Sequence, residues 1–354
     1  MDTITVVRRR TDVARFRRWL WFAQLLSLVL PAVAAGPDPS SETQPLPAAA
    51  VNEDAANVAD AALLAAPTTR DHIGRVVVPV MINGQGPFRF IVDTGASHST
   101  ISPALAHTLG LKPSEVRSIL LDGITGSAQV SGVTIDKLQA GALTLQDAPM
   151  PVVWAPVMAG ADGILGAAGL NGQSLEVDFQ HNRVVIATEV TAAVRTVSTR
   201  LHGLRLTDGL ITLDTRVGRV PVRAVVDTGS PRTLGNLALR DAVSMPRSRG
   251  VMARLTSVYG ATEDVESGEV IAAPVISIGA LRILDVDVIC GDFHIFKVWG
   301  MEHKPAMIIG MDVLGTVTSL GIDFKHQDVY LASARGNGNP LAPNSVTSGA
   351  RVSH

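Results

Sequence analysis

The sequence predicts an all-β protein made of two copies of one domain, each with an aspartate where a buried strand ends. Two observations support this prediction. Residues 90–97 read Phe-Ile-Val-Asp-Thr-Gly-Ala-Ser, an apolar strand that ends in a carboxylate and a turn. Residues 224–230 read Ala-Val-Val-Asp-Thr-Gly-Ser and repeat the pattern 134 residues later. Since internal repetition fixes an architecture, the duplication is the first feature to establish.

The repeat extends well beyond these two segments, and its parts follow in the same order in both copies. The offset is 138 residues between Gly141–Asp147 and Gly279–Asp285. It is 144 between Gly163–Gly166 and the apolar segment that ends at Gly310. It is 145 between Val177-Asp178-Phe179 and Ile322-Asp323-Phe324. Because the offset only grows, the second copy is the first copy with small loop insertions.

Composition bounds the possible functions. A chain of 354 residues has room for about two domains. It is 46% hydrophobic but only 4% aromatic, so the cores must consist mostly of Val, Leu, Ile and Ala. The net charge is −2 for the whole chain and −6 without residues 1–34, which argues against a nucleic-acid partner. Cys290 is the single cysteine, and the histidines show no metal-site spacing, so we expect no disulfide, metal or cofactor.

Residues 1–34 have the pattern of an export signal. Six arginines precede the apolar run Trp19–Leu30, and Ala32-Val33-Ala34 supplies a cleavage pattern before Ala35. The alternative is an uncleaved anchor, although about 20 apolar residues are needed to span a bilayer. We therefore expect a periplasmic or secreted protein with no stable membrane insertion after cleavage.

Two segments lack the composition of a folded domain. Residues 35–70 are rich in Ala, Pro, Ser and acidic residues and predict a disordered linker or a propeptide. Residues 332–354 are rich in Gly, Asn, Pro and Ser and predict a disordered tail.

The domains themselves are expected at residues 71–190 and 204–331. In the first, strands at 75–82 and 88–92 flank a turn at 83–86, and Ser102-Pro103 begins a short helix that ends at Gly110. A hairpin is expected at 120–130, followed by short strands at 133–138, 143–145, 152–153 and 184–186. The second domain repeats this order, with a hairpin at 255–269 and a longer loop at 291–305.

Two buried carboxylates related by a duplication suggest one shared site between the copies. Like charges a few ångströms apart cannot both ionise, so Asp93 and Asp227 would hold one proton between them. Such a pair can activate a water by general acid–base catalysis. The hydroxyls of Thr94 and Thr228 can tie the two turns together, and the glycines that follow them let backbone N–H groups approach the carboxylates. Ser230 places a hydroxyl beside Asp227, where the first copy has Ala96. A hydrogen bond from that hydroxyl would make Asp227 the ionised member.

With these motifs the chain resembles the retropepsin-like aspartic peptidases, in the bacterial form that fuses two lobes in one polypeptide. Asp93-Thr94-Gly95-Ala96 and Asp227-Thr228-Gly229-Ser230 match the active-site signature of that family. Ile164-Leu165-Gly166 and Ile308-Ile309-Gly310 match a second signature that braces the active-site loops. The resemblance implies two closed β-barrel-like lobes that meet across a pseudo-two-fold axis, with a hairpin flap on each. The flap candidates are Gly123, Gly126, Tyr259 and Gly260.

The copies also depart from one another. Gly166-Ala167-Ala168 lacks the Met-Asp that follows Gly310, and Leu234-Gly235 stands where the first copy has Thr100-Ile101. The sequence predicts an exported aspartic endopeptidase that hydrolyses peptides or proteins with a water activated between Asp93 and Asp227. The alternative is an inactive peptide-binding pseudo-peptidase of the cell envelope, which would not require two buried carboxylates. We expect a monomer, with pairing of lobes between chains as the alternative arrangement.

Overall fold

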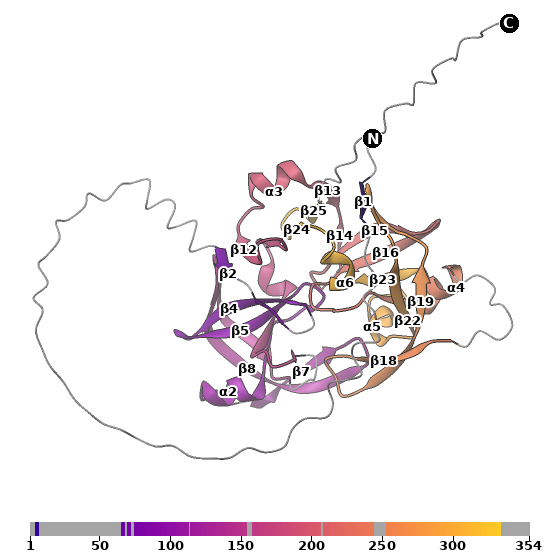
Figure 1. The fold of residues 1–354 in the computed structure, drawn as a ribbon. Coiled ribbons are helices and arrows are strands. Elements are labelled where there is room, and N and C mark those ends of the chain that lie inside the picture. Colours follow the sequence, from indigo (N-terminus) through magenta and orange to yellow (C-terminus); the bar gives the residue numbers. More distant parts are fainter. Residues whose placement is uncertain are drawn as a thin grey trace, which may run out of the picture. The chain divides into compact units, whose positions relative to one another are not determined.

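A computed structural model of the protein describes residues 4–6, 65–67, 69–71, 74–112, 114–153, 158–206, 208–243 and 253–333. These residues form three β-sheets and a few short helices (Figure 1). One sheet belongs to each half of the chain, and the third is shared by both halves. The prediction of an all-β protein with two related lobes is confirmed.

The sheet of the N-terminal lobe is built around β5 (Gln85–Asp93), the strand that ends in the first aspartate. Phe90 and Val92 point into one apolar cluster and Ile91 into another, so this stretch is buried on both faces. The turn at Asn83-Gly84 connects it to β4 (Val76–Ile82), and both turn residues have the positive φ that such a tight turn requires. The other strands are β3 (Thr69–Arg70), β6 (Thr100–Ile101), β7 (Ser114–Asp122), β8 (Ser127–Ala140), β9 (Leu143–Pro151) and β10 (Gly163–Gly166).

Two short helices complete this lobe. The helix α2 (Pro103–Thr108) begins after Ser102, whose hydroxyl accepts a hydrogen bond from the backbone N–H of Leu105, as expected for a serine that caps a helix. The 3-10 helix η3 (Ala167–Leu170) follows directly after β10. The predicted strand at 152–153 is wrong: Val152 makes only an isolated bridge to Ile101.

The C-terminal lobe repeats the arrangement in an eleven-stranded sheet. Its equivalent of β5 is β16 (Val220–Val226), which pairs with β15 (Ile211–Val217) as β5 pairs with β4. The other strands are β1 (Ile4–Val6), β14 (Leu204–Arg205), β17 (Leu234–Asn236), β18 (Leu255–Tyr259), β19 (Val265–Ala273), β20 (Ile276–Ile278), β21 (Leu281–Ile283), β22 (Val286–Gly291) and β23 (Ala306–Ile309). The helices are α4 (Leu237–Val243), α5 (His294–Val298) and α6 (Met311–Leu314).

The third sheet joins the halves through β11 (Ser174–Asp178) and β24 (Ser319–Asp323), which pair antiparallel. These are the strands that carry the repeat at offset 145. Glu176 lies opposite Gly321, its own equivalent, so a pseudo-two-fold axis passes between these two residues. The sheet continues with β25 (Asp328–Ala332) and β13 (Thr199–His202) on one side, and β12 (Arg183–Ala187) and β2 (Ala65–Pro67) on the other; α3 (Ala192–Val197) connects β12 to β13.

Aliphatic side chains fill the core, as the composition predicts. The fully buried set is dominated by Val, Ile and Leu, each of which contributes about 1.5–3 kcal/mol when removed from water. Four phenylalanines are the large aromatic exceptions, namely Phe90, Phe293, Phe296 and Phe324.

The ends of the chain require two corrections. Within the predicted linker, residues 65–67 and 69–70 are the strands β2 and β3, because their backbones pair with β12 and β4. The strand β25 extends to Ala332, the first residue of the predicted tail. Of the predicted export signal the structure describes only β1, which pairs with β21; its remainder, the rest of the linker and residues 334–354 lie outside the described residues. Among those described there is no helix with the length and apolar character needed to cross a bilayer.

Candidate active site

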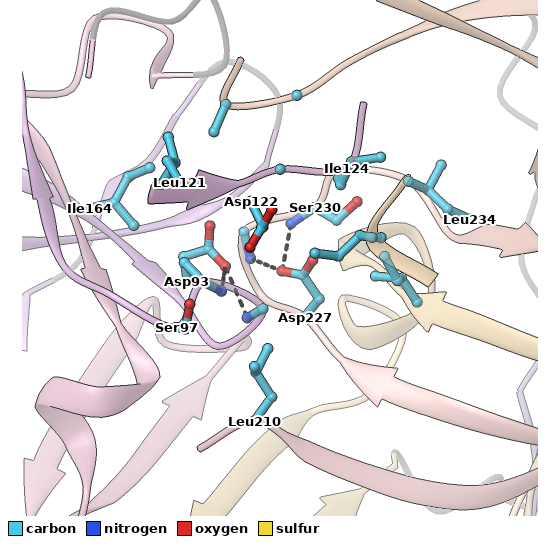
Figure 2. Close-up of a pocket in the computed structure, with 18 of the residues that line it drawn as sticks. Asp93, Ser97, Leu121, Asp122, Ile124, Ile164, Leu210, Asp227, Ser230 and Leu234 are labelled. Atoms are coloured by element: carbon cyan, nitrogen blue, oxygen red, sulfur yellow. Dashed lines mark hydrogen bonds between the residues drawn. The ribbon is translucent and has the colours of Figure 1, made fainter. Parts of the chain in front are cut away.

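Asp93 and Asp227 occupy matching turns, one in each lobe. Asp93 ends β5, and one of its carboxylate oxygens accepts hydrogen bonds from the backbone N–H groups of Gly95 and Ala96, both at 2.9 Å. Asp227 follows β16 and accepts from the N–H groups of Gly229 and Ser230 at 2.8 and 2.9 Å. Figure 2 shows the two side chains facing one another, with these hydrogen bonds as dashed lines. Each carboxylate is therefore oriented by its own turn.

The threonines tie the two turns together by reciprocal hydrogen bonds. The Thr94 hydroxyl donates to the carbonyl of Val226 at 2.7 Å and accepts from the Thr228 N–H at 3.1 Å. The Thr228 hydroxyl donates to the carbonyl of Val92 at 2.7 Å and accepts from the Thr94 N–H at 3.2 Å. Both side chains are buried, so no water competes for these bonds. The network fixes the separation of the two carboxylates.

The glycines of the two turns border the carboxylate of the opposite lobe. A Cβ atom on Gly95 would overlap the carboxyl group of Asp227, and one on Gly229 would overlap that of Asp93. Only glycine leaves room for the two acids to approach each other across the axis.

Burial and mutual repulsion change the acidity of the pair. Burial raises the pKa of Asp227 well above its ordinary value, and the nearby charge of Asp93 raises it further. Burial also raises the pKa of Asp93, but the hydrogen bond with Asp227, the N–H groups of its own turn and the positive charge of Arg75 counteract that rise. The proton shared by the pair therefore resides more on Asp227.

This order of acidity overturns the expectation that Asp227 is the ionised member. The Ser230 hydroxyl does not reach the carboxylate, because it donates to the backbone carbonyl of Arg232 at 2.7 Å. Only the backbone N–H of Ser230 contacts Asp227, as that of Ala96 contacts Asp93. The difference between serine and alanine at this position therefore has no direct effect on the acids.

The second pair of motifs supports the turns from behind. Ile164, Leu165 and Gly166 belong to β10, which runs parallel to β5 and places Gly166 opposite Asp93. Ile308 and Ile309 belong to β23, which runs parallel to β16 in the same way. Gly166 donates its N–H to the Ser99 hydroxyl at 3.1 Å, and Gly310 donates to the Thr233 hydroxyl at 3.2 Å. A Cβ on either glycine would meet the backbone of the turn, at His98 and Arg232 respectively.

Comparison with known proteins identifies this arrangement. The sequence profile of a family described as "Aspartyl protease" matches residues 78–168 and 213–313, one stretch in each lobe and together more than half of the chain. The chain belongs to the aspartyl protease family. Among solved structures it is similar to an aspartic proteinase from Irpex lacteus at 13% identity, over 76% of this chain and 97% of that one, with a TM-score of 0.46. No curated protein sequence matches it.

In this aspartyl protease a hairpin from each lobe covers the carboxylates. The tips are residues 123–126, between β7 and β8, and residues 260–264, between β18 and β19. We name them the N-terminal flap and the C-terminal flap. Together with the acids they enclose a cavity of about 470 Å³. Gly123, Tyr259 and Gly260 line this cavity, while Gly126 lies against Asp264 of the opposite flap.

The two flap tips meet. The hydroxyls of Thr125 and Thr262 lie 3.1 Å apart and are buried. These residues are equivalent in the two lobes, as are Thr94 and Thr228 below the acids. The pseudo-two-fold axis therefore passes between one threonine pair beneath the carboxylates and another above them.

Three further groups of the aspartyl protease site escaped the sequence analysis. Arg75 lines the cavity beside the acids and forms a buried ion pair with Asp71 at 2.7 Å. Thr125 and Thr262 recur at offset 137, so a residue-by-residue alignment of the two copies could have found them. Asp122 and His294 meet across the lobes but lie 172 residues apart, and neither has an equivalent that a repeat could reveal.

Proposed function

We propose that the chain is an exported aspartic-type endopeptidase that hydrolyses peptide bonds with a water activated between Asp93 and Asp227. The observation that carries this proposal is the pair of buried carboxylates, each oriented by two backbone N–H groups and both held at one separation by the crossed threonines. An inactive peptide-binding protein has no need for a pair of acids whose burial raises the pKa of both.

The order of acidity assigns the roles. Asp93, the stronger acid, is ionised and accepts a proton from the water as its oxygen attacks the peptide carbonyl carbon. Asp227 carries the shared proton and donates it to the carbonyl oxygen, so a neutral tetrahedral diol forms. Asp93 then passes its new proton to the leaving amide nitrogen while one hydroxyl returns its proton to Asp227. The C–N bond breaks to give an acid and an amine, and the pair regains its single proton.

The flaps supply the remaining requirement, which is to hold an extended peptide over the acids and exclude bulk water. The cavity between them is lined mainly by apolar side chains, with Leu210 below the acids and Leu121 and Ile164 beside Asp93 (Figure 2). A peptide or protein segment is therefore the proposed substrate.

The test is cleavage of a peptide library by residues 35–354, followed by mass spectrometry. We expect cuts at internal peptide bonds. Asp93→Asn and Asp227→Asn should each reduce kcat by about 10³-fold or more, because a neutral amide can neither accept the proton from water nor be the acid of a shared pair. The circular dichroism spectrum should stay unchanged. Wild-type protein that binds peptides without cutting them would favour the pseudo-peptidase, and a single mutant near the wild-type rate would refute the dyad.

Export is proposed from the pattern of residues 1–34. Expression of the full chain in a bacterium should yield a periplasmic or secreted protein whose first residue is Ala35, as read by N-terminal sequencing. Recovery of the intact N-terminus in the membrane fraction would instead indicate an uncleaved anchor.

A further inference from the structure

The helix α5 belongs to the C-terminal lobe but reaches the flap of the N-terminal lobe. It is fixed in its own lobe by Phe293 and Phe296, both almost fully buried, and Phe296 packs edge-on against Trp299 with ring centroids 6.1 Å apart. Ile295 and Trp299 line the cavity over the acids. The first residue of this anchored helix, His294, lies at the base of the N-terminal flap tip.

Three side chains make the contact. The Nε2 atom of His294 lies 2.8 Å from the hydroxyl oxygen of Ser127 and 3.3 Å from Oδ1 of Asp122. The Ser127 hydroxyl lies 2.5 Å from the same Asp122 oxygen. Asp122 and Ser127 are opposite one another in the β7–β8 ladder, on either side of the tip. The contact therefore holds both strands of the flap at the point where they leave the sheet.

The direction of these hydrogen bonds follows from the number of protons available. Ser127 has one hydroxyl proton, and the Asp122 carboxylate can only accept, so Ser127 donates to Asp122. The Ser127 oxygen must then accept from His294, which requires a proton on Nε2 of the imidazole. His294 is thus a donor to the flap whether its other nitrogen is protonated or not.

We infer that His294 is a positioning residue that holds the N-terminal flap closed over Asp93 and Asp227 from the opposite lobe. The role in catalysis rests on the proposed peptidase activity. The C-terminal flap is held differently: Tyr259, the counterpart of Asp122 by the offset of the two tips, is 56% exposed. The N-terminal flap is therefore the one attached at its base to the other lobe, and both flaps share the contact between Thr125 and Thr262 at their tips.

Loss of the donor should weaken substrate binding more than the chemical step. Without it the flap spends more time open, and the apparent affinity falls in proportion to the fraction of closed protein. We expect His294→Ala to raise KM about tenfold with kcat changed less than twofold. His294→Gln keeps an N–H donor at similar reach and should restore most of the affinity. His294→Glu places a second carboxylate beside Asp122 and should raise KM further than alanine does.

A measurement that needs no substrate tests the anchor itself. Hydrogen–deuterium exchange of residues 118–130 should be several-fold faster in His294→Ala than in the wild type, with His294→Gln close to the wild type. The control is His303→Ala in the same loop, because the His303 side chain is 91% exposed. If His294→Ala does not fold, Ser127→Ala removes the bridging oxygen from the flap side and should loosen the same residues.

Equal exchange in the wild type and His294→Ala would overturn the proposal, and so would a glutamine variant no better than alanine. Failure of the proposed function is a separate result. If the wild type cuts no peptide but residues 118–130 loosen in His294→Ala, the anchor stands and the peptidase assignment falls.

Discussion

The two lobes present the same turn to the cleft but differ in the residue beneath it. Arg75 precedes β4 and Leu210 precedes β15 at equivalent positions, and both line the cavity. Arg75 brings a buried positive charge, paired with Asp71, while Leu210 brings a buried hydrocarbon. The Asp-Thr-Gly turns therefore see different electrostatic surroundings although their own hydrogen bonds match. A duplicated motif thus acquires two roles through the residues around it.

This difference explains the order of acidity better than the residues inside the motif do. The cation beside Asp93 stabilises its ionised form and counteracts the effect of burial on its pKa. Asp227 has only its turn N–H groups for this purpose, and the negative charge of Asp93 works against them. The lobe with arginine supplies the base, and the lobe with leucine supplies the acid.

The largest effect is expected where the lobes are most alike. Gly95→Ala and Gly229→Ala each force a methyl group into the carboxylate of the opposite lobe, so both should reduce kcat/KM by about a hundredfold or more. Gly169→Ala is the control, because its Cβ would meet side-chain atoms at 3.2 Å or more. Peptide cleavage by the three purified variants checks this, and near-normal activity of either active-site variant would show that the acids are not closely apposed.

The second effect is a shift in pH dependence when the lobes are made more alike. We replace the ion pair as a whole, with Asp71→Asn and Arg75→Leu together, because a buried charge left without its partner costs about 3–5 kcal/mol. Loss of the cation raises the pKa of Asp93. Since activity requires one ionised carboxylate, the acidic limb of the kcat/KM profile should move to higher pH.

The matched control for this shift is the surface pair of Asp214 and Arg223, changed to Asn and Leu. That pair lies on the C-terminal lobe, with side chains 83% and 33% exposed. Solvent screens its charges, so the acidic limb should stay in place. An acidic limb that moves equally in both double variants would mean that Arg75 has no special effect on Asp93.

A smaller effect concerns the support behind the C-terminal turn. The Thr233 hydroxyl that receives the Gly310 N–H donates in turn to Asp312 at 2.7 Å, whereas the N-terminal lobe has Ala168 in place of that aspartate. Asp312→Ala makes the second lobe resemble the first and should lower the free energy of unfolding by about 1–2 kcal/mol. Urea denaturation measures this, and an unchanged midpoint would show that the threonine finds another acceptor.

The smallest effect is expected at Ser230. Because its hydroxyl bonds to the Arg232 carbonyl, Ser230→Ala and Ala96→Ser should leave the acidic limb of the pH profile where it is. A shift in opposite directions for the two variants would restore the idea that this hydroxyl sets the charge on Asp227.

The features that the sequence revealed are those that the duplication wrote twice. The aspartates, the threonines beside them and the glycines of the bracing segments recur at regular offsets, and a carboxylate at the end of a buried strand has few explanations other than a site. What escaped was singular or long-range. Arg75 matters because it is buried near Asp93, which depends on how β4 enters the sheet. His294 and Asp122 meet only when the two lobes are in place. The Ser230 hydroxyl was misassigned because a nearer backbone carbonyl competes for its proton.

The sheet shared by the lobes also sets a timetable for synthesis. The edge of β11 that pairs with β24 stays uncovered until about 145 further residues have left the ribosome, because β24 is encoded near the end of the chain. Until then the first lobe carries an unsatisfied strand edge, a feature that invites association with other chains. The same delay keeps Asp93 apart from Asp227, so the nascent chain holds no assembled pair of acids. Completion of the protein and completion of its cleft are therefore one event.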